Sequence, residues 1–419
     1  MTQTNILYAQ SGGVTAVINA TAAGVLAAAR EHSDEFGTVL AAHNGILGVL
    51  REDLYDTASL TDAEIERLSR TPGGAFGSCR FKLKDIDEDE THYRRLIDVM
   101  AAHNIRVFFY NGGGDSADTA HKVSQIGDRL GYRVQCIGIP KTIDNDLALT
   151  DTCPGFGSAA KFVTVATLEA SLDVIAMADT STKVFILEVM GRHAGWIAAA
   201  TGVIRNTQAD PPHIILLPER AFSRESFLAA VKQSVADHGF CTVVASEGVC
   251  DEHGRFLSDT GRRDAFGHAQ LGGVAPVIAD LINQELNLKC HWAVPDYLQR
   301  SARHLASAVD FEQALAVGRA AVEMAHAGEN AVMPVIERLA DAPYRWRTTS
   351  VPLAEVANRE RTLPDEFIAS DGFGITALAK RYFQPLLAGE SYPPYREGIP
   401  DYARLEMANV EKRLPSYDA

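Results

Sequence analysis

The chain has 419 residues, of which 46% are hydrophobic and 22% are charged. This length exceeds the usual size of one domain, so we expect two domains with a cleft between them. The formal net charge of -15 argues against nucleic acids and anionic membranes as partners, because both require a basic surface. The six cysteines lack CxxC or His-paired spacing, which indicates reduced thiols without a zinc site or a disulfide framework.

No stretch of the sequence predicts export or membrane insertion. The first ten residues, MTQTNILYAQ, lack a basic segment followed by an apolar one. No apolar run approaches the ~18 to 20 residues of a membrane helix. We therefore expect a soluble, cytoplasmic protein.

Short β-rich runs alternate along the chain with longer segments of helical period. In chain order the predicted strands are 5–10, 106–111, 133–140, 183–190, 213–219 and 241–248, and the predicted helices include 16–30 and 117–130. This alternation is typical of an α/β protein whose parallel sheet carries helices on both faces. We expect one domain over 1–150, completed by later segments, a second over 151–340, and a helical extension over 341–419 that packs back on the domains.

Several predicted strands end in glycine-rich or polar clusters, where the ligand of an open α/β sheet is expected. Gly12 and Gly13 precede a helix without a Walker lysine, so they either cradle a phosphate on backbone N–H groups or form a tight turn. The run 111–116 holds three glycines, more than a turn needs, and also Asp115. Asp115 could hold a metal that bridges phosphate oxygens, or it could only cap a helix.

A glycine-rich loop over residues 73–84 carries three cations, Arg80, Lys82 and Lys84. The planar fork of Arg80 could bind a phosphoryl group as its charge shifts during transfer. A basic loop that faces water explains the same residues.

The heptapeptide from Pro140 to Asp146 carries the groups that phosphoryl transfer needs. One carboxylate must take a hydroxyl proton, another must hold Mg2+, and a cation must offset the developing charge. Asp144, Asp146 and Lys141 supply this set within six residues. The alternative is an Asx-rich turn with a lysine that points to water.

Further polar residues follow the later strands: Met190-Gly191-Arg192, Glu247, and Tyr297 with Arg300. An arginine at a strand end suits the phosphate of a sugar phosphate, and a glutamate can accept its hydroxyl protons. Each residue could instead form an interdomain ion pair or a helix cap.

Taken together and in this order, the motifs SGG, GGAFGSCRF, NGGGDS, PKTIDND, EVMGR, SEG and YLQRS, over residues 1 to about 305, resemble the phosphofructokinase family. The resemblance implies two Rossmann-like three-layer α/β/α domains with a substrate cleft between them. PKTIDND in place of PGTIDND, and an acid in place of glycine before Ser116, are similar to the pyrophosphate-dependent branch. The length, with HAQLGG followed by YLQRS, resembles its shorter homomeric forms.

The resemblance also implies a reaction, namely reversible in-line transfer of a phosphoryl group from pyrophosphate to the 1-hydroxyl of fructose 6-phosphate, with Mg2+ as cofactor. At the matching positions, Asp144 is the base, and Asp115 or Asp146 binds the metal. Pyrophosphate is assigned to Gly12, Gly13, Arg80 and Lys141, and fructose 6-phosphate to Thr142, Asp144, Met190, Gly191, Arg192, Glu247, Tyr297 and Arg300. Asp115 would also repel the α-phosphate of ATP.

Two positions are expected to act across a subunit boundary. Lys183 and His291 stand where family members often have arginines that reach a neighbouring subunit's sugar phosphate. The resemblance thus implies a homo-oligomer, either dimer or tetramer, assembled through the sugar-phosphate domain. His268, within HAQLGG, is expected to be structural.

Three other functions fit parts of the sequence. An ATP-dependent sugar-phosphate kinase of the same fold is disfavoured by Lys141 and Asp115. A catalytically inactive regulatory subunit is disfavoured because Asp144, Lys141 and Arg192 are all retained. A dinucleotide-binding oxidoreductase ranks last, because no GxGxxG motif opens a βαβ unit.

Overall fold

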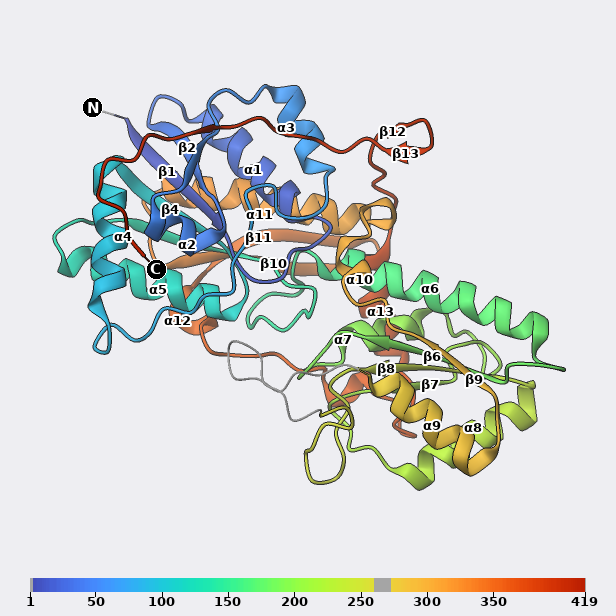
Figure 1. Ribbon diagram of the computed structural model, residues 1–419. Helices are drawn as coiled ribbons and strands as arrows, with labels where there is room; N and C mark the ends of the chain where they lie inside the picture. Colours follow the sequence, from blue (N-terminus) through green and yellow to red (C-terminus); the bar gives the residue numbers. More distant parts are fainter. Residues whose placement is uncertain (1–2, 260–272, 419) are drawn as a thin grey trace.

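The computed structural model describes residues 3–259 and 273–418, which form two α/β lobes (Figure 1). Each lobe is built on a parallel sheet whose two faces are covered by helices. The predicted α/β class is therefore confirmed. Each β-rich run of the sequence forms a strand, and both predicted helices are present with their ends shifted by one to three residues.

The larger sheet has eight strands in the order β11-β10-β5-β4-β1-β2-β3-β14. Strands β2, β1, β4, β5 and β10 are parallel, whereas β11, β3 and β14 pair antiparallel at the edges. Their bounds are β1 (Thr4–Gln10), β2 (Phe36–Ala42), β3 (Leu54–Asp56), β4 (Ile105–Gly112), β5 (Gln135–Pro140), β10 (Val332–Asp341), β11 (Tyr344–Pro352) and β14 (Ala408–Asn409).

Alternate residues of β1 supply the two cores of this lobe, because successive strand side chains point to opposite faces. Ile6 and Tyr8 pack on the side covered by α1 (Ile18–Glu31), α3 (Asp62–Ser69) and α11 (Ala308–His326). Leu7 and Ala9 pack on the side covered by α2 (Gly45–Arg51), α4 (Glu90–Ala102), α5 (Gly114–Arg129) and α12 (Leu353–Val356). Because the helices cover the two faces of the sheet, the polar residues at the carboxyl ends of the strands lie outside both cores and can form a site.

The smaller sheet has four parallel strands in the order β7-β8-β6-β9, with bounds β6 (Val184–Val189), β7 (Ile214–Leu216), β8 (Cys241–Ser246) and β9 (Cys290–Ala293). One face packs against α6 (Phe156–Met177), α7 (Trp196–Ala200) and α13 (Ala377–Phe383). The other face packs against α8 (Arg224–His238) and α9 (Val274–Leu286). Short connections complete this lobe, namely η1 (Thr201–Ile204), α10 (Leu298–Ser301), η2 (Arg303–Leu305), η3 (Asp365–Phe367) and η4 (Gln384–Leu387).

The last third of the chain departs from the predicted division at residues 340 and 341. Helix α11 and strand β10 belong to the first lobe, and β11 completes an antiparallel hairpin with β10. The extension is therefore only partly helical. After α13 it returns along the first lobe, through the small β12 (Tyr395–Arg396) and β13 (Ile399–Pro400) pair, until β14 joins β3 (Figure 1). The continuous run of buried residues from Met333 to Ile336 is typical of a strand inside a sheet, which explains why this segment joins the first lobe's sheet.

All six cysteines are free, and no group of three or more His, Cys, Asp or Glu residues in the described part of the chain is arranged to hold a metal alone. Among the described helices, none combines the length and apolarity needed to cross a membrane. His268 and most of HAQLGG lie outside the described residues.

Candidate active site

Four of the predicted clusters, those at residues 11–13, 73–84, 111–116 and 140–146, meet at one cavity of about 220 Å³. This cavity lies at the carboxyl ends of β1, β4 and β5. The sheet order explains this, because these three strands are adjacent although their sequences are far apart. The lining residues are Ser11, Gly12, Gly13, Cys79, Arg80, Phe81, Lys82, Gly113, Gly114, Asp115, Ser116, Lys141, Thr142, Asp144 and Asp146. We call this space the donor cavity.

The turn after β1 forms one wall of the donor cavity. Gly12 has φ 73°, a left-handed conformation that favours glycine. Its N–H donates to the Cys79 carbonyl at 2.9 Å, and the Ser78 hydroxyl donates to its carbonyl at 2.7 Å. These bonds fasten the glycine-rich loop to the turn and so place Arg80 over the cavity.

Two guanidinium groups approach the backbone of Gly13. A Cβ at this position would lie 2.6 Å from Nη1 of Arg300 and 3.8 Å from Nη2 of Arg80. Opposite this wall, α5 begins at Gly114, so its positive end also faces the cavity. These walls thus bring several positive groups to the donor cavity in a protein of net negative charge.

Lys141 lies directly after β5 and is only 4% exposed. Its Nζ donates to the Gly13 carbonyl at 2.7 Å, which aims the ammonium group into the donor cavity. Burial lowers the pKa of Lys141 to about 8, and the nearby Arg300 and Arg80 act in the same direction, while Asp144 opposes them. A lysine so placed is charged at neutral pH and can bind an anion strongly.

Asp144 is oriented by Thr142. The Asp144 N–H donates to the Thr142 hydroxyl at 3.1 Å, and that hydroxyl lies 3.2 Å from Oδ2 of Asp144, to which it donates. Burial raises the pKa of Asp144, and the Thr142 hydrogen bond, Lys141, Arg300 and Arg80 oppose this rise. A carboxylate with these neighbours is held rigidly and is more basic than one in water.

The two candidate metal ligands lie in different surroundings. Asp146 forms no ion pair in the described part of the chain, and burial, Asp144 and Glu360 raise its pKa to about 7. Asp115 is exposed and pairs with Lys82 at 2.9 Å. The sequence places Lys82 among the loop cations but does not indicate its ion pair with Asp115. The half-buried, unpaired Asp146 is better suited to a divalent cation than the neutralised Asp115.

The second candidate cluster lies at the carboxyl ends of β6 and β8. Gly191 has φ 137°, and a Cβ there would meet the Ala194 carbonyl at 2.6 Å and the Ser246 hydroxyl at 2.8 Å. Its N–H donates to Oε1 of Glu247 at 3.4 Å. Burial, followed by the charge of Asp144, raises the pKa of Glu247 to about 7. Met190 and Arg192 flank this turn, so these two residues, Gly191 and Glu247 lie together, within reach of the charge of Asp144.

Arg300 lies between the two clusters. Its guanidinium lies 3.9 Å from the centre of the exposed Tyr297 ring and also reaches Gly13. The sequence assigned Arg300 to the sugar phosphate alone. Because Arg300 comes from the second lobe and touches the wall of the donor cavity, it can contact either substrate.

Lys183 is distant from both clusters of its own chain. It precedes β6, whereas Met190 follows that strand, and seven residues at ~3.3 Å each separate them by about 23 Å. His291 lies on β9 opposite Phe185, at the same end of the sheet. Neither residue can therefore join the site of its own chain.

Comparisons with known proteins decide the family. The phosphofructokinase family model matches residues 5–325. The chain belongs to the phosphofructokinase family. It is 60% identical over 420 residues to a pyrophosphate--fructose 6-phosphate 1-phosphotransferase of Xanthomonas campestris pv. campestris, with 100% of both chains covered. A protein of the same name from Halomonas elongata is 57% identical, again over 100% of both chains. A crystal structure of a pyrophosphate-dependent phosphofructokinase from Marinobacter aquaeolei is 55% identical, with a TM-score of 0.92 over 99% of this chain and 100% of the other.

This phosphofructokinase has site residues that the motifs did not reveal. His193 and Glu360 form an ion pair of 3.0 Å beside Asp146 and help line a second cavity of about 500 Å³ next to the donor cavity. Arg361 follows Glu360 and binds the backbone of the heptapeptide that carries Asp144. His193 directly follows Arg192 of the MGR motif, so its place at the site could have been predicted from the sequence. Glu360 and Arg361 lie beyond residue 325, in a stretch without any recognisable motif.

Proposed function

We propose that this phosphofructokinase transfers a phosphoryl group from inorganic pyrophosphate to the 1-hydroxyl of fructose 6-phosphate, giving fructose 1,6-bisphosphate and phosphate, in a reversible reaction. The observation that carries this proposal is the donor cavity. It measures only about 220 Å³, and Lys141, Arg80 and Arg300 surround it. Such a space suits a small, highly charged donor.

Asp144 acts as the general base in this proposal. It receives the proton of the 1-hydroxyl as the sugar oxygen attacks the phosphorus, and the cleaved phosphate leaves in line. Thr142 holds the carboxylate by the bonds described above, so little reorganisation is needed at the moment of transfer. Lys141 and Arg80 offset the charge that develops on the transferred group. Because both substrates meet at one base, no phosphoenzyme is needed.

Fructose 6-phosphate occupies the second cluster in this proposal. Arg192 grips the 6-phosphate, and Glu247 accepts hydroxyl protons of the sugar. Met190, Gly191 and Tyr297 shape the pocket around the ring. Arg300 bridges the two substrates, which is supported by its position beside Gly13.

Mg2+ is the proposed cofactor, and Asp146 is the residue that best fits it. Magnesium binds through one or two carboxylates together with substrate phosphates, so the single half-buried carboxylate of Asp146 at the donor cavity is sufficient. When bound, the ion would neutralise charge on the phosphate oxygens. Asp115 is a weaker candidate because Lys82 already neutralises it.

The Asp115–Lys82 pair also bears on donor choice. It joins α5 to the glycine-rich loop at the donor cavity, and a longer polyphosphate would have to displace it. The carboxylate would then lie against a phosphate, and the repulsion between the two negative charges opposes ATP. We propose that this pair, together with Lys141, restricts the donor to pyrophosphate.

A homo-oligomer completes the proposal, since Lys183 and His291 can serve only a neighbouring chain. Large apolar side chains are exposed beside them, including Leu172 (57%), Met177 (47%) and Trp292 (49%). Their position on α6 and on the edge strand β9 supports an interface at this end of the second lobe. A cytoplasmic location remains a prediction.

A coupled assay with fructose 6-phosphate tests the donor, by comparing pyrophosphate with ATP at equal concentrations. We expect activity with pyrophosphate and very little with ATP. Asp115→Gly, and more so its combination with Lys141→Gly, should weaken the use of pyrophosphate and open an ATP activity. A wild-type preference for ATP would overturn the proposed donor while leaving the acceptor and the base intact.

A further inference from the structure

We propose that Arg361 is a positioning residue that holds the loop carrying Asp144 in its reactive geometry and ties this loop to the sugar-phosphate lobe. The inference rests on the proposed function, because it concerns the base of that reaction. It assigns a role to a segment, residues 357–363, that lies outside the part matched by the family model.

The loop that carries the base needs an external support. Asn145 lies between Asp144 and Asp146, is fully buried and has φ 56°, a conformation uncommon for residues other than glycine. Two carboxylates on either side of it repel each other in a poorly hydrated place. Both effects favour an altered loop, so other contacts must hold the observed one.

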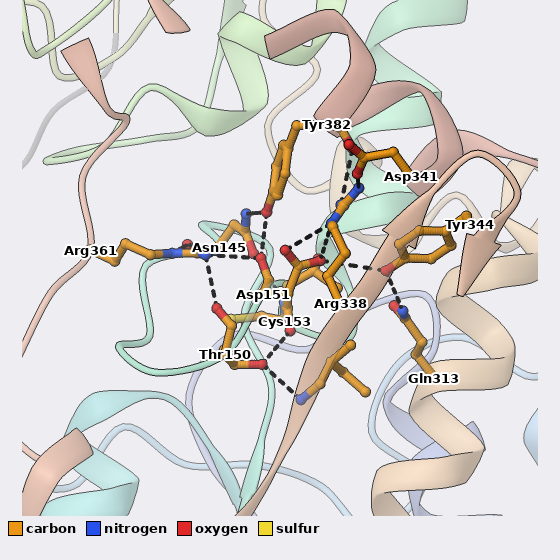
Figure 2. A network of polar contacts seen from close by, with 12 residues as sticks. Asn145, Thr150, Asp151, Cys153, Gln313, Arg338, Asp341, Tyr344, Arg361 and Tyr382 are labelled. Atoms are coloured by element: carbon orange, nitrogen blue, oxygen red, sulfur yellow. Dashed lines mark hydrogen bonds and ion pairs between the residues drawn. The ribbon is translucent and has the colours of Figure 1, made fainter. Parts of the chain in front are cut away.

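The guanidinium of Arg361 provides this support through backbone carbonyls. Its Nη2 and Nε donate to the Asn145 carbonyl at 2.9 and 3.3 Å. Its Nη1 donates to the carbonyls of Thr150 and Asp151 at 2.8 and 2.9 Å. One rigid group thus joins the two ends of the loop 145–151, as Figure 2 shows.

The backbone of Arg361 adds to this grip. Its N–H donates to the Asp146 carbonyl at 2.6 Å, and the preceding Glu360 forms an antiparallel bridge with Leu147. Within the described part of the chain, Arg361 forms no ion pair with a carboxylate and uses its charge on carbonyl dipoles. The loop therefore requires the planar guanidinium of Arg361 with its several N–H donors, and a positive charge alone is not enough.

Arg361 also contacts the second lobe. Its guanidinium lies 4.4 Å from the centre of the Trp196 ring, and Nε1 of Trp196 donates to the Arg361 carbonyl at 3.0 Å. Trp196 is buried at the start of α7, a few residues after Arg192 in the sugar-phosphate cluster. Arg361 therefore fixes the base relative to the element that presents the acceptor sugar.

A second arginine in the same network provides a matched control. Arg338 binds Asp151 at 2.9 and 3.0 Å and lies over the Tyr344 and Tyr382 rings (Figure 2). Among the residues that the structure describes, no hydrogen bond or ion pair joins it to residues 144–146. If the network only stabilises the fold, loss of either arginine should act alike. If Arg361 positions the base, the two losses should differ in turnover.

The experiment compares Arg361→Gln, Arg361→Lys and Arg338→Gln with the wild type in the pyrophosphate-dependent assay, well below each melting temperature. We expect Arg361→Gln to lower kcat by about 10- to 100-fold with KM for fructose 6-phosphate changed less than about threefold, because an ångström of displacement costs about that much in rate. Arg361→Lys keeps the charge without the fork and should remain at least about fivefold slow. Arg338→Gln should lower the melting temperature and leave kcat near the wild-type value.

The outcomes separate the inference from the function on which it rests. A wild type inactive with pyrophosphate overturns the proposed function itself. An active wild type with unchanged kcat in Arg361→Lys overturns the positioning role, and this variant serves if Arg361→Gln fails to fold. Equal losses of kcat in Arg338→Gln and Arg361→Gln, in step with their melting temperatures, would also overturn it, because both would then act through stability alone.

Discussion

At the scale of single residues, the proposed reaction depends on Asp144. Replacing Asp144 with Asn keeps the size and the Thr142 contact but removes the proton acceptor. We expect kcat to fall by about 10³-fold or more, while KM for fructose 6-phosphate changes little, because the base acts mainly in the transition state. Steady-state kinetics at saturating pyrophosphate would measure this. Turnover close to that of the wild type would remove Asp144 from the role.

Lys141 gives the enzyme a predicted alkaline limit. Burial lowers its pKa to about 8, so the ammonium is charged below this value and loses its proton as the pH rises through it. In the proposed reaction, pyrophosphate binding to the free enzyme needs that charge, so kcat/KM for pyrophosphate should fall above pH 8, approaching about tenfold per pH unit. Lys141→Arg should move the decline to higher pH, since arginine stays charged. If kcat/KM declines at the same pH in that variant, the decline belongs to another group.

At the scale of elements, the sequence predicted those parts of the site that follow strands. The runs before Gly12, Asn111 and Lys141 are apolar and bounded by turn residues, so their strands and their shared edge could be foreseen. Arg361 could not be foreseen, because its partners are backbone carbonyls, which leave no trace in side-chain pattern. The division at residues 340 and 341 placed β10 in the second domain and β11 in a helical extension, because sheet order across two hundred residues depends on tertiary packing and cannot be read from local pattern.

The contact between α1 and α11 explains why the late helix belongs to the first lobe, and it can be tested. Gly24 lies so close that a Cβ would meet the Leu315 carbonyl at 2.3 Å, and a Cβ on Gly318 would meet the Thr21 carbonyl at 2.2 Å. Both obstacles are backbone atoms, which cannot swing away. Gly24→Ala should therefore destabilise the protein by about 1–3 kcal/mol despite the better helix propensity of alanine. A lower midpoint in urea would confirm this, and an unchanged midpoint would mean that the helices separate easily.

At the scale of the whole molecule, the role proposed for Lys183 would make assembly part of the chemistry. This residue and His291 lie at the far end of β6 from Arg192, beside the exposed apolar side chains of α6 and β9. If two copies join there, each can present its Lys183 to the other's sugar phosphate. The interface and the site would then be lost together.

Leu172 lies on the proposed interface with 57% exposure, and Leu339, with 49%, lies on β10 of the other lobe. Leu172→Asp should lower the mass measured by light scattering and raise KM for fructose 6-phosphate, because a buried, unpaired charge opposes association. Leu339→Asp should change neither, which controls for the charge itself. A wild type that is monomeric and fully active at assay concentration would contradict the prediction.

Mixed oligomers sharpen this last prediction. A chain with Lys183→Ala and His291→Ala keeps its own Arg192, and a chain with Arg192→Ala keeps the two residues that it lends. Each variant alone should bind fructose 6-phosphate poorly, since every site lacks one cationic contact. A hybrid formed after dissociation and reassembly would contain one site with all of them, so the mixture should recover part of the wild-type activity at low fructose 6-phosphate. If the mixture is no more active than the two variants measured apart, the site is complete within one chain and Lys183 has no part in it.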